Sequence, residues 1–143
     1  MGKRRSSREL ALKFLYQFEL NKGDLDEQIK LFLERNSSQE GVENFMKELV
    51  VSLIDKMEEV DGIIQKFSDH WVLDRMTVID RNILRMGTCE LLFNFSTPPK
   101  VVINEAIEIA KKYGNEDSPE FINGILDKVY NEIGQKGPLP FTS

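Results

Sequence analysis

Few residues of this sequence have the type and spacing that catalysis or metal binding requires. Cys89 and His70 are the only cysteine and the only histidine among 143 residues. They leave no partner for an intramolecular disulfide and too few ligands for a structural zinc site. A cysteine nucleophile needs a base beside it, and the apolar residues around Cys89 favour a buried core thiol instead. We therefore expect no enzyme activity, no metal site and no cofactor.

Glu105 and Glu108 have a spacing that could support metal chemistry, because residues three apart are neighbours on a helix. Helices that bind paired metals also need a histidine three residues after a glutamate, and Lys111 stands at that position. Solvated or salt-bridged carboxylates are the simpler interpretation. The glycines are scattered singly, so the chain has no glycine-rich phosphate loop.

With catalysis and metal binding disfavoured, the basic residues indicate binding of an anionic ligand. Residues 1–22 contain six basic and two acidic residues, so a chain of net charge −5 has +4 at its start and −9 in the rest. Four of these cations surround the predicted start of the first helix, where the helix dipole also favours phosphate oxygens. We call them the N-terminal basic cluster: Lys3, Arg4, Arg5 and Arg8. A basic N-terminal segment on an otherwise acidic chain indicates nucleic-acid binding, although many basic termini only increase solubility.

A second basic cluster, Lys111 and Lys112 with Tyr113, precedes the last predicted helix. Lysines at a helix C-terminus also compensate the helix dipole, so a structural role and a binding role both remain open. The two clusters would indicate a nucleic-acid-binding surface if the fold brought them side by side.

The elements that must position these residues are helices, because apolar residues recur at three and four positions and no stretch alternates long enough for a strand. A capping box at Ser6–Glu9 predicts the start of the first helix, with Gly23 as its left-handed end. Asp24 predicts the start of a second helix. The strongest apolar stripe runs from Val42 to Phe67. Further helices are predicted over residues 77–95, 101–113 and 118–134, the last with Ser118 as N-cap.

The pattern predicts an all-α fold, a compact bundle of about seven helices in two packed halves. One domain spans residues 1–143, with an N-terminal half of about 6–67, a C-terminal half of about 71–134 and a loose tail of 135–143. His70 and Trp71 are expected to pack and cap at a helix entrance. No apolar run approaches the ~18 residues of a membrane span, and the N-terminus lacks the apolar segment of a signal peptide. The chain is expected in the cytoplasm.

Three parts of the sequence resemble the NusB family of bacterial transcription antitermination factors. The first is Arg8–Gln17, and the second combines Trp71–Met76 with Ile79–Arg85. The third and most specific is Val101–Lys111, followed by Phe121–Asp127 at the family's spacing. The resemblance runs from about residue 4 to residue 133, which is nearly the whole chain.

The resemblance implies an all-helical fold of two packed bundles and a role in antitermination. Members of the family pair with the ribosomal protein NusE and grip the single-stranded boxA element of nascent transcripts, chiefly from ribosomal RNA operons. RNA polymerase then reads through terminators. By position, the RNA-facing residues should be the N-terminal basic cluster and the region of Asp117, Ser118 and Phe121 after the second basic cluster. The NusE-facing residues should include Tyr16, Asp74, Asp80 and Leu84.

Several of these roles stay open in the sequence. Phe121 belongs to an apolar stripe, so core packing competes with base stacking, and Asp80 could instead cap the helix that follows Thr77. Tyr16 lies off the core stripe of its helix and suits an interface. Acidic residues would suit a basic ribosomal protein. The modest number of cations predicts weak RNA binding by the chain alone, which NusE should tighten.

Two rival functions come from other classes of protein. A helical protein–protein adapter would bind no RNA, so neutralising Arg4, Arg5 and Arg8 would leave the affinity for short RNA unchanged. RNA cytosine methyltransferases have a similar helical domain ahead of a catalytic one. These 143 residues contain no cofactor-binding unit, so we expect RNA recognition and not methyl transfer.

Overall fold

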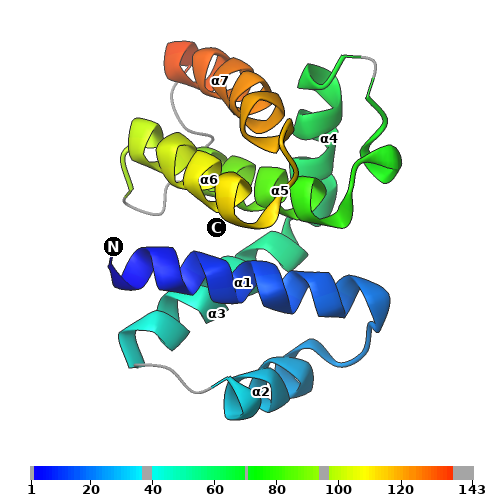
Figure 1. Cartoon of the computed structure of the whole chain (residues 1–143), viewed down its shortest axis with the longest axis vertical. Helices are drawn as coiled ribbons and strands as arrows, with labels where there is room; N and C mark the ends of the chain where they lie inside the picture. The colour runs from blue at the N-terminus through cyan, green and yellow to red at the C-terminus, as the bar shows by residue number, and fades with distance from the viewer. Residues whose placement is uncertain (1, 37–39, 70, 94–96, 137–143) are drawn as a thin grey trace.

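The periodic apolar stripes become helices in the computed structural model, which describes residues 2–36, 40–69, 71–93 and 97–136 (Figure 1). These residues form seven α-helices and one 3₁₀ turn, and no strand, which confirms the all-α prediction. In chain order they are α1 (Lys3–Leu20), α2 (Leu25–Arg35), α3 (Glu40–Asp55), α4 (Met57–Phe67), η1 (Leu73–Arg75), α5 (Val78–Phe93), α6 (Pro99–Tyr113) and α7 (Ser118–Lys136).

The first helix begins earlier than the capping box predicts. α1 starts at Lys3, directly after Gly2, and no side chain caps this end. The prediction that Ser6 is the N-cap is therefore wrong: Ser6 lies inside the helix, and Ser7 beside it is buried 2.8 Å from the carbonyl oxygen of Val42 on α3. The helix therefore contains about one more turn at its start than the capping box predicts. The N-terminal basic cluster consequently lies on regular helix.

The junction between α1 and α2 also corrects one prediction and confirms another. α1 ends at Leu20 with Asn21 as its C-cap, and Gly23 does not have the positive φ of a left-handed cap. The start of α2 is as predicted, because the Asp24 carboxylate accepts a hydrogen bond from the Glu27 backbone amide at 3.0 Å.

The long apolar stripe from Val42 to Phe67 is divided between two helices. α3 ends at Asp55 and α4 begins at Met57, with Lys56 out of helical geometry at φ −105° and ψ 16°. α4 then packs against α5 and α7. The chain thus passes from a first half, α1–α3, to a second half, α4–α7, at Lys56 (Figure 1). The sequence placed this division after Phe67, because the apolar period continues through the change of direction.

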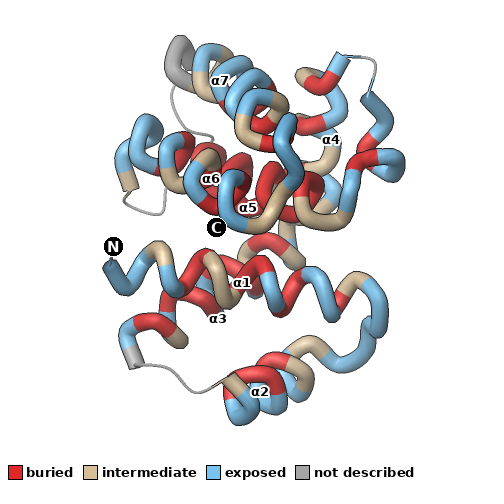
Figure 2. Tube along the Cα trace, viewed as in Figure 1, coloured by how far each residue is buried: buried red, intermediate tan, exposed pale blue. Residues whose placement is uncertain are grey.

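α5 lies at the centre of the fold and contacts α1, α3, α4, α6 and α7. Figure 2 shows it as a nearly continuous buried segment. Gly87 permits its close approach to α7, since a Cβ there would lie 2.9 Å from Leu126 Cδ1. Burial extends to polar residues of α5, among them Arg81, Asn82 and Glu90, and buried polar groups need partners. Those partners determine how the two halves meet.

The last helix is longer than predicted, since α7 continues past Gly134 to Lys136. Ser118 is its first helical residue, and Asp117 precedes it. The predicted role of His70 and the tail after residue 136 fall outside the described residues. Within the described part, no helix has the length and apolar character to cross a bilayer, and no group of three potential metal ligands occurs.

Candidate nucleic-acid interface

The N-terminal basic cluster lies on the first two turns of α1, with its four side chains in different surroundings. Arg5 donates two hydrogen bonds to the Glu105 carboxylate on α6, at 2.8 and 2.7 Å. The Arg4 guanidinium lies 4.0 Å from the centre of the Phe45 ring, and Lys3 is exposed. Lys3 and Arg4 form no ion pair with any described residue. Arg4 also donates to the Thr97 hydroxyl at 3.4 Å, so these two cations have no carboxylate that competes with a ligand.

Arg8 does not project from the start of α1 as the sequence suggested. Its side chain is buried, and it donates two hydrogen bonds of 2.7 Å to the Glu90 carboxylate on α5. The reason is its place on the helix, since it follows Ser7 on the face that α3 and α5 cover. Arg8 therefore joins the two halves, and any effect of its loss on RNA binding acts through the fold.

The second basic cluster lies beside α1. The Glu9 carboxylate accepts hydrogen bonds from Lys112 Nζ at 3.0 Å and from the Tyr113 hydroxyl at 2.9 Å. Lys13, one turn further along α1, has its ammonium 6.0 Å from the centre of the Tyr113 ring. Lys111 is paired within α6 to Glu108 at 3.2 Å. The fold thus brings the end of α6 next to the N-terminal basic cluster. The sequence of either cluster does not predict this proximity.

Electrostatics on this face hold the carboxylates ionised. The hydrogen bond from Arg5 lowers the pKa of Glu105, and the same contact raises the pKa of Arg5. Burial alone would raise the pKa of Glu9, but the hydrogen bonds from Lys112 and Tyr113 outweigh it, so this pKa lies below its usual value. At neutral pH the face therefore contains both signs of charge in close contact.

The other predicted RNA residues lie at the start of α7 and directly before it, and their side chains differ in exposure. Asp117 is exposed. Ser118 is buried, and its hydroxyl donates to Asp80 Oδ1 at 2.6 Å, so it is not free to read a base edge. Phe121 is half-buried against the core and meets the exposed Trp71 ring edge-on, 5.6 Å between centres. No described contact joins Phe121 to the basic clusters.

The predicted NusE-facing residues divide in the same way. Tyr16 and Asp74 are exposed, the tyrosine by 44%. Leu84 has no exposed surface, and Asp80 is buried with its carboxylate on Ser118. The backbone amide of Asp80 also donates to the Thr77 hydroxyl, at 3.1 Å. Asp80 and Leu84 lie on the side of α5 that meets the other helices, so in this structure they offer no surface to a partner.

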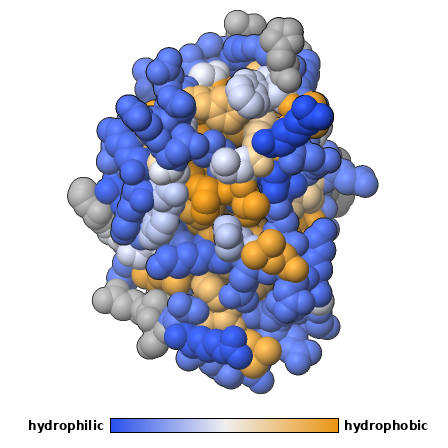
Figure 3. Space-filling model, turned by 45° about the vertical axis from the view of Figure 1, so that its right-hand side comes forward, coloured by the Kyte–Doolittle hydropathy of each residue, from blue (hydrophilic) through white to orange (hydrophobic). Residues whose placement is uncertain are grey.

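A groove of about 530 Å³ separates the two halves near the C-terminal end of α1. Leu15, Phe18, Ile54 and Met57 supply its apolar lining. Figure 3, which brings this side of the molecule forward, shows apolar surface between hydrophilic rims. Asp74 also lines the groove.

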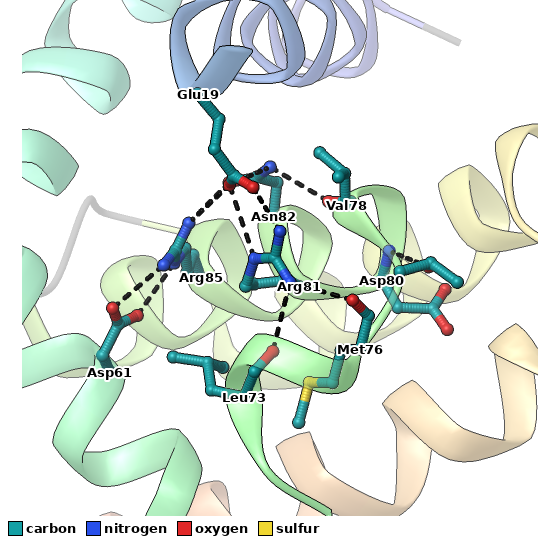
Figure 4. A network of polar contacts seen from close by, with 10 residues as sticks. Glu19, Asp61, Leu73, Met76, Val78, Asp80, Arg81, Asn82 and Arg85 are labelled. Carbon is teal, nitrogen blue, oxygen red and sulfur yellow. Dashed lines mark hydrogen bonds and ion pairs between the residues drawn. The ribbon is translucent and has the colours of Figure 1, made fainter. Parts of the chain in front are cut away.

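A network of ion pairs in this groove joins the halves (Figure 4). Glu19 on α1 accepts from both Arg81 and Arg85 on α5, and Arg85 donates two further bonds to Asp61 on α4, at 2.8 and 3.0 Å. Arg81 also donates to the carbonyl oxygens of Leu73 and Met76, at 3.1 and 2.8 Å, which fixes η1. Burial would raise the pKa of Glu19, but the hydrogen bond and charge of Arg81, with the charge of Arg85, hold it below its usual value.

Comparison with known proteins agrees with this architecture. The family model described as "NusB family" matches residues 5–131. The chain belongs to the NusB family. The transcription antitermination protein NusB of Ruminiclostridium cellulolyticum is 44% identical over 137 residues, which covers 96% of this chain and 91% of the relative. That of Trichlorobacter lovleyi is 45% identical over 129 residues, covering 90% and 91%.

Solved structures of the NusB family have the same fold. T. maritima NusB matches with a TM-score of 0.82 and 36% identity, covering 90% of this chain and 91% of that one. A chain from the complex of the antitermination factors NusB and NusE with dsRNA matches with a TM-score of 0.81 and 32% identity, covering 92% and 98%. The family match, residues 5–131, includes the second basic cluster and the lining of the groove, and it begins at Arg5 within the N-terminal basic cluster.

Sequence reasoning missed the carboxylates that organise this surface. Glu9, Glu90 and Glu105 each accept from a predicted RNA-binding cation, yet Glu105 was considered only as a metal-ligand candidate, Glu9 only as a capping residue and Glu90 not at all. Their partners lie 82 to 103 residues away in the chain, so no local spacing reveals the pairs. The exposure of Trp71 was also missed, because an aromatic residue at a helix entrance normally packs.

Proposed function

We propose that this chain is a bacterial transcription antitermination factor that binds the single-stranded boxA RNA of nascent ribosomal RNA transcripts together with the ribosomal protein NusE. In this role it acts within a transcription complex with RNA polymerase, which then reads through terminators. Membership of the NusB family supports the proposal, as do relatives named transcription antitermination proteins and a similar chain in a complex of NusB, NusE and dsRNA.

The observation that carries the RNA-binding part is the meeting of two basic segments on one face. Glu9 contacts both Lys112 and Tyr113, which places the end of α6 beside the first turns of α1. Exposed cations such as Lys3 and Arg4 suit phosphates. The exposed ring of Trp71 beside Phe121 has the chemistry for base stacking, although no described contact joins it to the basic clusters.

The observations that support a protein partner are the exposed Tyr16 on α1 and the groove beside α1, which Asp74 lines. Tyrosine is favoured at the centre of interfaces, and an acidic residue beside an apolar groove is complementary to a basic ribosomal protein. Asp80 and Leu84 would act from beneath this face by fixing the start of α5.

Recognition without catalysis is part of the proposal. Cys89 is buried, and burial raises the pKa of its thiol to about 12, so the reactive thiolate is not formed near neutral pH. Among the described residues it is the only cysteine, and the chain has no other.

A titration of the purified chain tests the proposal. Fluorescence anisotropy of a labelled boxA RNA and a scrambled RNA of equal length would be measured with and without NusE. We expect preference for boxA and severalfold tighter binding when NusE is added. Equal affinity for both sequences, or no effect of NusE, would contradict it, and no RNA binding at all would favour the adapter.

A pair of charge-matched variants separates local contacts from net charge. Arg4→Gln removes an exposed cation of the N-terminal basic cluster, and Lys66→Gln removes one from α4, where it pairs with Glu132 at 3.9 Å. The first should weaken boxA binding and reduce its salt dependence, while the second should leave both unchanged. Binding of NusE should be the same for both variants.

A further inference from the structure

Glu9 occupies a position on the proposed RNA face that a phosphate group would also suit. Its carboxylate oxygen accepts from Lys112 Nζ at 3.0 Å and from the Tyr113 hydroxyl at 2.9 Å. Its side chain is 18% exposed, whereas that of Lys112 is 61% exposed. A ligand from solvent can therefore reach the lysine while the glutamate stays fixed beside it.

The surroundings of Glu9 are otherwise cationic. Glu9 lines a hollow of about 590 Å³ together with Lys3, Ser6 and Lys13. Lys13 is near enough for its charge to lower the pKa of Glu9, after the larger effects of burial, Lys112 and Tyr113. An anion is thus already present at the point where cations of α1 and α6 converge.

A second carboxylate stands in the same relation to the N-terminal basic cluster. Glu105 is held by Arg5 through two hydrogen bonds of 2.8 and 2.7 Å, with the arginine side chain 31% exposed. Lys3, Arg4 and Lys13 form no ion pair with any described residue. The cations of this face therefore form two groups, those paired to a carboxylate of the neighbouring helix and those without a carboxylate partner.

We propose that Glu9 and Glu105 are internal competitors of RNA phosphates, which lower RNA affinity by occupying Lys112 and Arg5. The inference rests on the proposed RNA-binding function and assigns a regulation to that same surface. Exposed ion pairs are weak and exchange readily, so a phosphate can share or displace the carboxylate. The same pairs join α1 to α6. They therefore keep this face ordered when no RNA is bound, and they lower its affinity for RNA.

The test is the isosteric variant Glu9→Gln in the full chain, with the labelled boxA RNA as probe. Glutamine still accepts from Lys112 and Tyr113, so the fold is retained, but the competing charge is gone. One additional phosphate contact should steepen the slope of log affinity against log salt by about 0.7, which corresponds to about fivefold tighter binding at ~0.1 M salt. Glu105→Gln, which releases Arg5, should give a similar gain independently.

A double variant identifies Lys112 as the released cation. Lys112→Gln should weaken boxA binding less in the wild type than in the Glu9→Gln background, because Glu9 already competes for that lysine in the wild type. Combined with Glu9→Gln, it should abolish the gain. An equal effect of Lys112→Gln in both backgrounds would overturn the proposal.

The control is Glu132→Gln, which removes the same charge from α7, where Glu132 pairs with Lys66. It should leave boxA affinity within twofold of the wild type. A gain equal to that of Glu9→Gln would mean that net charge alone matters, and unchanged or weaker binding by both folded variants would refute competition. A wild type that binds no boxA RNA would instead refute the proposed function, so the two failures are distinct.

Discussion

The two ends of α1 use the same kind of contact in different surroundings. Near the N-terminal end, Arg5 and Lys112 are 31% and 61% exposed, and each has a single carboxylate partner. Near the C-terminal end, Arg81 and Arg85 are 10% and 13% exposed, and both share Glu19. One end offers its cations to solvent, and the other encloses them.

The difference teaches how one helix can both bind a ligand and join two halves. Exposed single pairs are individually weak and open to exchange. Enclosed pairs that share partners cannot lose one member without leaving another charge unpaired away from water. We therefore propose that the N-terminal end of α1 binds the ligand and that its C-terminal end holds the two halves in alignment. Arg8 is the exception, because it lies near the first end but is enclosed.

The largest effect should come from the most deeply enclosed pair. Glu90→Ala leaves the Arg8 guanidinium buried without its carboxylate, which should lower the free energy of unfolding by about 3–5 kcal/mol. Urea denaturation of the two proteins measures the change. The double variant Arg8→Met with Glu90→Leu should recover most of that loss, since an apolar pair of similar volume is tolerated. A decrease in the free energy of unfolding of less than about 1 kcal/mol for Glu90→Ala would contradict the proposed difference between enclosed and exposed ion pairs.

An intermediate effect is expected from Glu19 at the enclosed end. Glu19→Gln removes the charge that Arg81 and Arg85 share, which should cost roughly 1.5–3 kcal/mol of unfolding free energy, as for hydrogen bonds to charged groups. RNA affinity should not change at neutral pH. The control Glu132→Gln, at a partly exposed ion pair and measured in the same way, should change the free energy of unfolding by less than about 0.5 kcal/mol.

The same residue predicts a pH dependence. The pKa of Glu19 in the folded protein lies below the ordinary 4.5, so its stabilisation is complete above that value and is lost as the pH falls through the lowered pKa. Urea unfolding between pH 7 and pH 3 should show wild-type stability falling below about pH 4.5, and Glu19→Gln should have a shallower decline. Parallel curves for the two proteins would show that Glu19 does not contribute.

The smallest effect on stability is expected at the exposed end, where function should change instead. Arg4→Gln should alter the free energy of unfolding by less than about 0.5 kcal/mol while weakening boxA binding about fivefold at ~0.1 M salt, for one lost phosphate contact. Anisotropy and urea denaturation on one preparation provide both values. A variant that loses stability and keeps its RNA affinity would reverse the assignment of the two ends.

The sequence predicts the helices well because their cause is local. The spacing of Ala11, Phe14, Leu15 and Phe18 defines a buried face without reference to the rest of the chain, and all four are buried. Asp24 caps its helix through an amide three residues away. The break at Lys56 is hidden for the same reason, since an apolar stripe keeps its period across a bend when both segments face one core.

The site is predicted less completely because burial of its residues depends on distant contacts. The sequence identifies both basic clusters, and nothing local distinguishes Arg4, which stays exposed, from Arg8, which meets Glu90 across 82 residues. Leu84 and Asp80 were assigned to a surface by position in a motif, yet α5 is covered on nearly every side. Where a helix is central, the amphipathic pattern that separates inside from outside is lost.

The buried contact between residues 8 and 90 has a consequence for synthesis of the protein. A ribosome makes α1, α2 and α3 long before the carboxylate that neutralises Arg8 exists, so the emerging first half lacks the partner needed to close its core. Its helices can form early, but their stable docking must wait until α5 has been translated. A fragment of residues 1–55, which contains α1, α2 and α3 alone, should therefore stay loosely folded, and cooperative folding should begin once α5 is present.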